Sequence, residues 1–240
     1  MFYRRQILKT LINCSLALGL DFSNRNQIQS AIAAPVKTTI SLDDIVDNDA
    51  AVKKIAADDF GHLISKSPSS VIKPNSAEDV IKTIQFARQN KIKIAARGQG
   101  HSTYGQSQVE NGIVIDMNSL NKIHSIDNNR VVVDGGVVWS QLVQKILEKN
   151  LTPPVLTDYL GLSVGGTLSV GGVGGAAHRY GLQVDNVLEL LVATGAGKLE
   201  TCSRSENPEL FEAVLAGLGQ CGIIVKATIK AITAPENARV

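Results

Sequence analysis

The chain has 240 residues, of which 44% are hydrophobic and 19% charged, a composition typical of a globular protein with enough apolar material for a core. A net charge of +2 gives no reason to expect nucleic acid as the main partner, and no apolar run after the N-terminus is long enough to span a bilayer. Cys14, Cys202 and Cys221 form neither a disulfide framework nor a metal-ligand spacing, although a bond between the last two stays open.

Residues 1–34 are typical of a targeting segment. Arg4 and Arg5 precede a modest apolar run, and Ala31-Ile32-Ala33 supplies small residues that a signal peptidase accepts. The pattern resembles a twin-arginine export signal and predicts a protein exported to the periplasm or the extracellular space, without a stable membrane span. An uncleaved N-terminal extension is the alternative.

The next segments predict a helical lead-in over residues 35–65 and then a strand, a helix and a second strand. A short strand ends at Pro74, and Ser76 is a suitable N-cap for a helix with acidic residues in its first turn. With a strand at residues 92–96, these elements form a βαβ unit.

A glycine-rich loop follows that strand, and the chain is organised around it. It reads Arg97-Gly98-Gln99-Gly100-His101-Ser102 and continues to Gln106. Its glycines allow sharp turns and a close approach to a ligand, and successive backbone N–H groups in such a loop suit a phosphate. A plain loop histidine that bonds to backbone is the alternative to a functional role for His101.

Three short strands are predicted at residues 113–116, 122–126 and 130–134, separated by turns that contain Asn or Asp. A helix follows over residues 139–149, and we expect Trp139 to pack in the core rather than to contact a cofactor.

A second glycine-rich stretch lies between Gly165 and Gly175. Its glycines alternate with Ser, Thr, Val and Leu, and the interleaved apolar residues argue against a flexible linker. The stretch predicts a second surface that a ligand can approach closely.

The C-terminal part predicts a strand at residues 187–194, its hairpin partner at residues 198–202, a helix that starts at Asn207, and a strand at residues 223–229. Residues 217–222 match G-x-G-x-x-G, but they follow a helix and precede a strand. This order is the reverse of the dinucleotide-binding fingerprint, which is therefore rejected.

The two glycine-rich loops, together with Thr157-Asp158-Tyr159-Leu160, His178-Arg179-Tyr180-Gly181 and Gly217-Leu218-Gly219-Gln220, resemble the FAD-binding domain of the vanillyl-alcohol-oxidase superfamily (PCMH type). Within it, the pattern is most similar to the cytokinin dehydrogenases. The resemblance implies an α/β and α+β fold over residues 66–236, with a small βαβ lobe and a larger antiparallel lobe with helices that hold FAD between them. It also implies a chain that stops, with a short tail at residues 237–240, before the substrate-binding cap.

The resemblance assigns roles to individual residues. His101 would bond covalently to the flavin, and Asp158 would lie at the cofactor and take a proton from a substrate amine as hydride moves to the flavin. The other expected cofactor contacts are Ala96, Gly98, Gln99, Gly100, Ser102, Gln106, Ser163, Ser169, Val173 and Ile224.

The flavin would perform the hydride step, while the protein orients it and stabilises the charge that develops. Two alternatives to a small amine substrate stay open. The first is an FAD-linked oxidase of a sugar or an alcohol. The second is a flavin-binding module that is inactive alone or is completed by a separate C-terminal chain or cap. Residues 170–172 and 176–178 depart from the family pattern.

Overall fold

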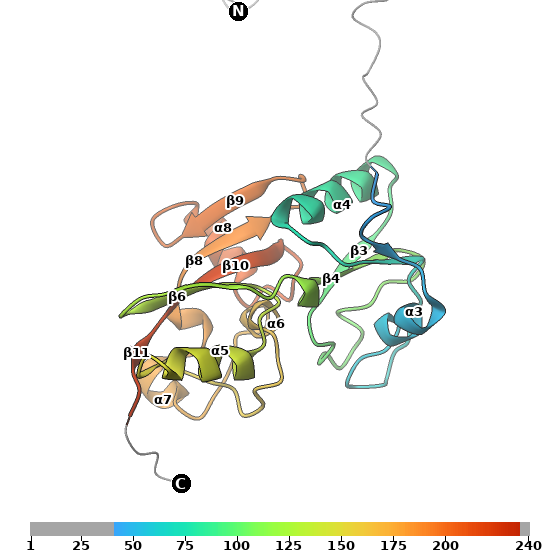
Figure 1. Ribbon diagram of the computed structural model, residues 1–240. Helices are drawn as coiled ribbons and strands as arrows, with labels where there is room; N and C mark the ends of the chain where they lie inside the picture. The colour runs from blue at the N-terminus through green and yellow to red at the C-terminus, as the bar shows by residue number, and fades with distance from the viewer. Residues whose placement is uncertain (1–40, 236–240) are drawn as a thin grey trace, which may run out of the picture. The chain divides into compact units, whose positions relative to one another are not determined.

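The computed structural model describes residues 41–235 (Figure 1). The expected targeting segment at residues 1–34, the first residues of the lead-in and the tail at residues 237–240 lie outside the described residues. Within residues 41–235, no helix combines the length and apolar character that a bilayer span requires.

A four-stranded sheet forms the smaller lobe. Its strands, in spatial order, are β1 (Val46–Asp47), β2 (Ser70–Ile72), β4 (Ile113–Asp116) and β3 (Ile94–Arg97). Strands β2, β4 and β3 run parallel, and β1 pairs antiparallel with β2. Helix α4 (Ala77–Gln89) connects β2 to β3, so the predicted βαβ unit is present. Ser76 caps this helix as predicted, because its hydroxyl accepts a 3.2 Å hydrogen bond from the amide of Asp79.

The three short strands predicted at residues 113–116, 122–126 and 130–134 do not lie side by side in one sheet, because β4 is separated from the other two. It lies between β2 and β3, in the four-stranded sheet, whereas the two strands that follow it belong to the other sheet. Ile113, Val114 and Ile115 are all at least 97% buried, so β4 needs cover on both faces. Ile113 and Ile115 pack in one cluster with residues of α4, and Val114 packs in another cluster with Ala56.

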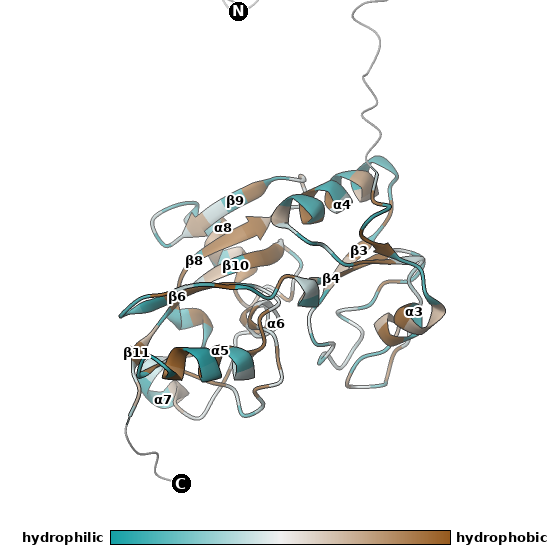
Figure 2. Ribbon diagram, in the orientation of Figure 1, coloured by the Kyte–Doolittle hydropathy of each residue, from teal (hydrophilic) through white to brown (hydrophobic). Residues whose placement is uncertain are grey.

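A five-stranded antiparallel sheet forms the larger lobe. Its strands, in spatial order, are β5 (Ile123–Ile126), β6 (Arg130–Asp134), β10 (Ile223–Lys230), β8 (Val187–Ala193) and β9 (Leu199–Ser203). The predicted hairpin of β8 and β9 is confirmed by their continuous antiparallel register. The hydrophobic colouring on β8 and β10 in Figure 2 fits their central place in the sheet.

Short elements complete the fold. They are η1 (Met117–Ser119), α5 (Trp139–Leu147), β7 (Leu151–Thr152), α6 (Val164–Leu168), α7 (Ala177–Tyr180), η2 (Val184–Asn186), α8 (Pro208–Val214) and β11 (Ile232–Thr233), which pairs with β7. Helices α5, α6 and α8 pack their buried side chains with those of β6, β8 and β10 in one core. Trp139 is fully buried in this core, as the sequence predicted.

Two expectations need correction. The lead-in is not mostly helical: in its described part, only α3 (Ala50–Ala56) is an α-helix, and β1 precedes it. The second glycine-rich stretch is not wholly a loop, because α6 forms at its start. Buried Val164, Thr167 and Leu168 supply the core contacts that offset the low helix propensity of the two glycines between them.

The two lobes share a hydrophobic core and direct hydrogen bonds. Ala193, Ile223 and Val225 from the larger sheet pack in one cluster with residues of the smaller sheet and α4. On the surface of α4, Gln85 donates a 2.9 Å hydrogen bond to the carbonyl of Gly197, and Arg88 donates one to Ala196. These contacts hold the two sheets against each other.

Candidate functional site

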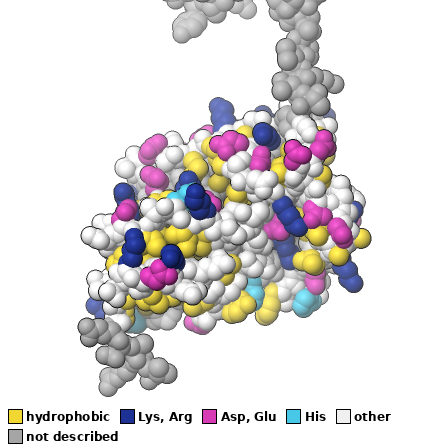
Figure 3. All heavy atoms as spheres, viewed as in Figure 1, with side chains coloured by type: hydrophobic (Ala, Val, Ile, Leu, Met, Phe, Trp, Pro, Cys, Tyr) yellow, Lys and Arg dark blue, Asp and Glu magenta, His cyan; other side chains and the backbone are white. Residues whose placement is uncertain are grey.

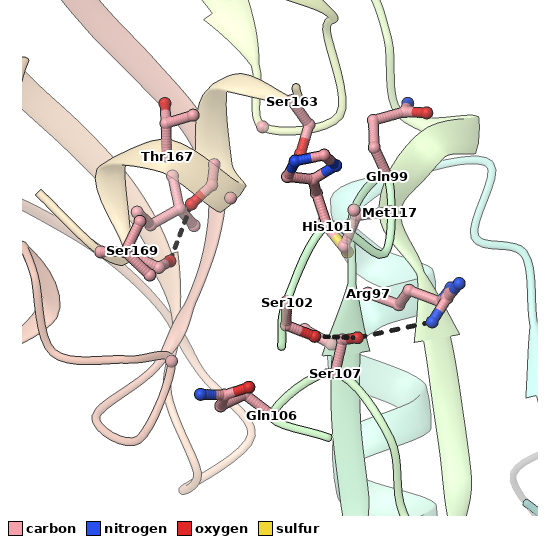
Figure 4. Close-up of a pocket in the computed structure, with 18 of the residues that line it drawn as sticks. Arg97, Gln99, His101, Ser102, Gln106, Ser107, Met117, Ser163, Thr167 and Ser169 are labelled. Atoms are coloured by element: carbon pink, nitrogen blue, oxygen red, sulfur yellow. Dashed lines mark hydrogen bonds between the residues drawn. The ribbon is translucent and has the colours of Figure 1, made fainter. Parts of the chain in front are cut away.

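A cavity of about 390 Å³ is lined by both lobes, and this volume lies in the range of small-molecule sites. Its walls come from residues 96–107, 162–170 and 218–224, together with Met117 and Gly135. The two glycine-rich stretches that the sequence singled out are thus brought together, although about 60 residues separate them. Figure 4 shows the first loop facing α6 across the cavity.

Most of the residues that the resemblance assigned to the cofactor line this cavity. They are Ala96, Gly98, Gln99, Gly100, His101, Ser102, Gln106, Ser163, Ser169 and Ile224. Val173 does not line it, and its side chain is 70% exposed in the loop after α6. Asp158 does not line it either; it is exposed, and its neighbour Tyr159 stacks on His101.

The first loop is held by a buried carboxylate that the sequence analysis missed. Asp59 is 3% exposed, and its Oδ2 accepts hydrogen bonds from the hydroxyl of Ser102 at 2.9 Å and from the amide of Gly105 at 2.8 Å. Its Oδ1 accepts from the amide of Gly61. Gly105 has φ +71°, a conformation that glycine adopts readily. The hydrogen bond to Asp59 gives its buried N–H a partner.

Backbone hydrogen bonds join the same segment to the loop on both sides of His101. Phe60 donates its N–H to the carbonyl of Gly100 at 2.9 Å, and Gly61 donates to the carbonyl of Ser102 at 3.1 Å. A side chain at position 61 would collide with the backbone of Thr103. The local sequence Asp59-Phe60-Gly61 does not identify Asp59 as a support of the loop, because nothing in it indicates a partner more than 40 residues away.

Arg97 is the residue at the end of β3 that ties the loop to the preceding segment. Its guanidinium donates to the carbonyl of Asp58 at 2.7 Å and contacts the hydroxyl of Ser107, which in turn bonds to that of Ser102 (Figure 4). Burial lowers the pKa of Arg97 from its ordinary value, and the nearby carboxylates of Asp116, Asp59 and Asp58 oppose that shift. The group nevertheless stays charged at any physiological pH.

His101 lies between two aromatic rings. Its ring centroid is 4.0 Å from that of Phe60 and 5.2 Å from that of Tyr159, with interplanar angles of 23° and 29°. His101 lines the cavity, whereas neither of the two rings does.

The opposite wall is the start of α6, which the core holds in place. The indole N–H of Trp139 donates a 2.8 Å hydrogen bond to the hydroxyl of Thr167, and both side chains are buried. The amide of Gly165 donates to the carbonyl of Gly135 at 2.7 Å. Ser163 and Ser169, at the two ends of α6, line the cavity (Figure 4).

The chemistry of these walls fits FAD. Glycines of all three segments line the cavity, and a side chain in place of Gly98 would collide with the side chain of Ser163, so the backbone of the first loop lies close to that serine. Met117, Leu162 and Ile223 supply apolar surface for a ring system, while serine, threonine and glutamine side chains supply polar partners. Among the described residues, no group of three His, Cys, Asp or Glu side chains is arranged to bind a metal ion.

Comparisons with known proteins support this reading. A 48% identical relative, over 77% of this chain, is an uncharacterized oxidoreductase of the fasciation locus of Rhodococcoides fascians, and cytokinin dehydrogenase 3 of Arabidopsis thaliana is 47% identical over 77% of the chain. The structure of 6-hydroxy-D-nicotine oxidase from Arthrobacter nicotinovorans matches 83% of this chain with a TM-score of 0.72 and 30% identity, and 44% of that chain is covered.

The chain spans 42% and 36% of the length of the two curated relatives. The family model described as an FAD binding domain matches residues 68–203, which include both glycine-rich loops and His101. The chain therefore belongs to this family of FAD-binding domains.

Proposed function

We propose that this chain is the FAD-binding part of an oxidoreductase that removes hydride from a carbon beside an amine of a small molecule. The observation that carries the proposal is the place of Asp158. Its carboxylate is exposed, one residue from the ring that stacks on His101 at the cavity. We infer that a carboxylate there would reach a substrate bound against the cofactor, although Asp158 itself does not line the cavity. The similarity to a cytokinin dehydrogenase supports the same substrate class.

The bound flavin would supply the two-electron acceptor for the hydride. Asp158 would accept the proton from the substrate N–H, and its negative charge would stabilise the positive charge that develops on the amine. Gln99, Ser163 and Ser169 would orient the cofactor from the two walls. Arg97 stays engaged with Asp58 and would hold the loop rather than take part in the reaction.

The test is the reduction of bound flavin by amines under anaerobic conditions. We expect Asp158→Asn to lower the rate by about 100-fold, a typical contribution of a general base, with unchanged FAD content. Asp127→Asn, at an exposed carboxylate that pairs with Arg130, is the matched control and should keep the wild-type rate. A wild-type rate for Asp158→Asn would exclude its role, and reduction by alcohols or sugars alone would favour the other oxidase class.

We further propose that His101 bonds covalently to the flavin. The bond would form between an imidazole nitrogen and a flavin carbon; each gives up one hydrogen as a proton, and the two electrons released pass to dioxygen or another two-electron acceptor. We expect His101→Ala to keep FAD in the native protein but to lose flavin fluorescence from the band on a denaturing gel. Fluorescence of equal strength in the variant would contradict this assignment.

We also propose that residues 1–34 direct export of the protein, with both Arg4 and Arg5 required. Replacing both arginines by lysine should retain the protein in the cytoplasm, as measured by cell fractionation. An unchanged distribution would argue for an uncleaved N-terminal extension instead.

A further inference from the structure

Two aromatic rings stack on the imidazole of His101. Phe60 and Tyr159 both stack on the imidazole, at centroid distances of 4.0 Å and 5.2 Å. Within residues 41–235, no side-chain hydrogen bond holds either ring nitrogen of His101. Stacking is therefore the interaction that sets the orientation of the ring.

Phe60 is the better fixed of the two rings. Its own amide bonds to the carbonyl of Gly100, the residue before His101, and the amide of Gly61 bonds to the carbonyl of Ser102, the residue after it. The buried carboxylate of Asp59 adds a third attachment through Ser102. The backbone on both sides of Phe60 is thus locked to the backbone on both sides of His101.

The exposure of Phe60 supports a role other than core packing. Its side chain is 59% exposed, and it belongs to none of the clusters of buried apolar residues. An exposed phenylalanine contributes little to the hydrophobic core, so the contact with His101 is what its position provides. Aromatic pairs of this kind have a preferred geometry, which would restrict the imidazole to one orientation.

We propose that Phe60 is a positioning residue for His101: it holds the imidazole at the cavity and so accelerates the formation of the bond to the flavin. Tyr159 stacks on the same imidazole and supports it at a longer distance. This inference rests on the proposed covalent role of His101. The reaction is the same: one proton leaves the imidazole nitrogen, another leaves the flavin carbon, and a two-electron acceptor such as dioxygen takes the two electrons.

The first test follows covalent attachment over time. Protein from riboflavin-limited cells is mixed with FAD in air, and samples are denatured and read for flavin fluorescence in the protein band. We expect Phe60→Leu, which keeps an apolar side chain but removes the ring, to slow attachment about 3- to 10-fold at equal bound FAD. Phe60→Tyr should restore the wild-type rate. Leu63→Ala, a neighbouring residue with 67% exposure, is the matched control and should change nothing.

The second test needs no flavin. In the NMR spectrum of the apoprotein, ring currents from Phe60 should displace the ring-proton resonances of His101, and this displacement should be lost in Phe60→Leu and kept in Phe60→Tyr. Attachment by Phe60→Leu at the wild-type rate, or an unchanged His101 signal in that variant, would overturn the proposal. If the wild-type protein acquires no covalent flavin, the role of His101 fails, and the NMR comparison still decides whether Phe60 orients its ring.

Discussion

A single carboxylate illustrates how much the cavity depends on individual residues. Asp59 accepts hydrogen bonds from Ser102, Gly105 and Gly61, and replacing it by alanine would leave buried donors without a partner. We expect Asp59→Ala to lower the free energy of unfolding by about 1–3 kcal/mol, measured by urea denaturation. The side chain of the neighbouring Asp58 is half-exposed, so Asp58→Asn should change stability by no more than about 0.5 kcal/mol. Equal effects of the two substitutions would contradict this account of the loop.

The two described cysteines should differ in reactivity. Cys202 is fully buried in the larger lobe, and its desolvation, together with the nearby carboxylates of Glu189, Glu200 and Glu206, raises the pKa of its thiol to about 11. Cys221 is exposed, and both thiols are free, so the bond between them that the sequence left open does not form. We expect iodoacetamide at pH 8 to alkylate Cys221 and to leave Cys202 unmodified until the protein is unfolded. Rapid labelling of Cys202 in the native protein would show that the larger lobe opens.

At the scale of elements, the hydrogen bond between α5 and α6 holds one wall of the cavity. Thr167→Val keeps the shape of the side chain but removes the hydroxyl that accepts from the indole of Trp139. The buried N–H would then lack a partner, and we expect a loss of about 1–3 kcal/mol in the free energy of unfolding. Thr167→Ser keeps the hydroxyl and is the control. A stable Thr167→Val protein with unchanged FAD affinity would show that α6 is held by its apolar contacts alone.

Local patterns in the sequence predicted many of these elements. Helix α4 followed from its cap and acidic first turn, the β8–β9 hairpin from its glycine turn, and the first loop from its glycine spacing. The place of β4 and the partner of Asp59 could not be predicted, because both depend on contacts between distant segments that leave no local periodicity. The short helix α6 was missed since glycines normally interrupt helices, and core burial outweighs that preference here.

At the scale of the whole molecule, FAD should bind to the folded protein and stabilise it by mass action. The His101→Ala variant is suited to this measurement because its binding would stay reversible. At a free FAD concentration 100 times the dissociation constant, we expect a gain of about 2.7 kcal/mol and a rise of roughly 5–10 °C in the melting temperature. ATP, which lacks the flavin, should give a smaller rise. No shift with FAD would mean that the cavity does not bind the cofactor in this chain.

The face drawn in Figure 3 carries no large patch of a single charge sign. Positive and negative side chains alternate over the face in Figure 3, in agreement with the net charge of +2. We therefore attribute affinity for FAD to contacts inside the cavity rather than to electrostatic attraction from a distance.

The most direct test of the central claim is to find which residue carries the flavin. Trypsin cleaves after Arg97 and after Lys122, so the peptide of residues 98–122 contains His101 and no other histidine. The protein is purified with its cofactor, denatured, digested and analysed by mass spectrometry. We predict that the flavin mass is found on this peptide, as expected if His101 faces FAD in the cavity between the two lobes. An unmodified peptide 98–122, or flavin on a peptide that carries His62, His124 or His178, would contradict the account.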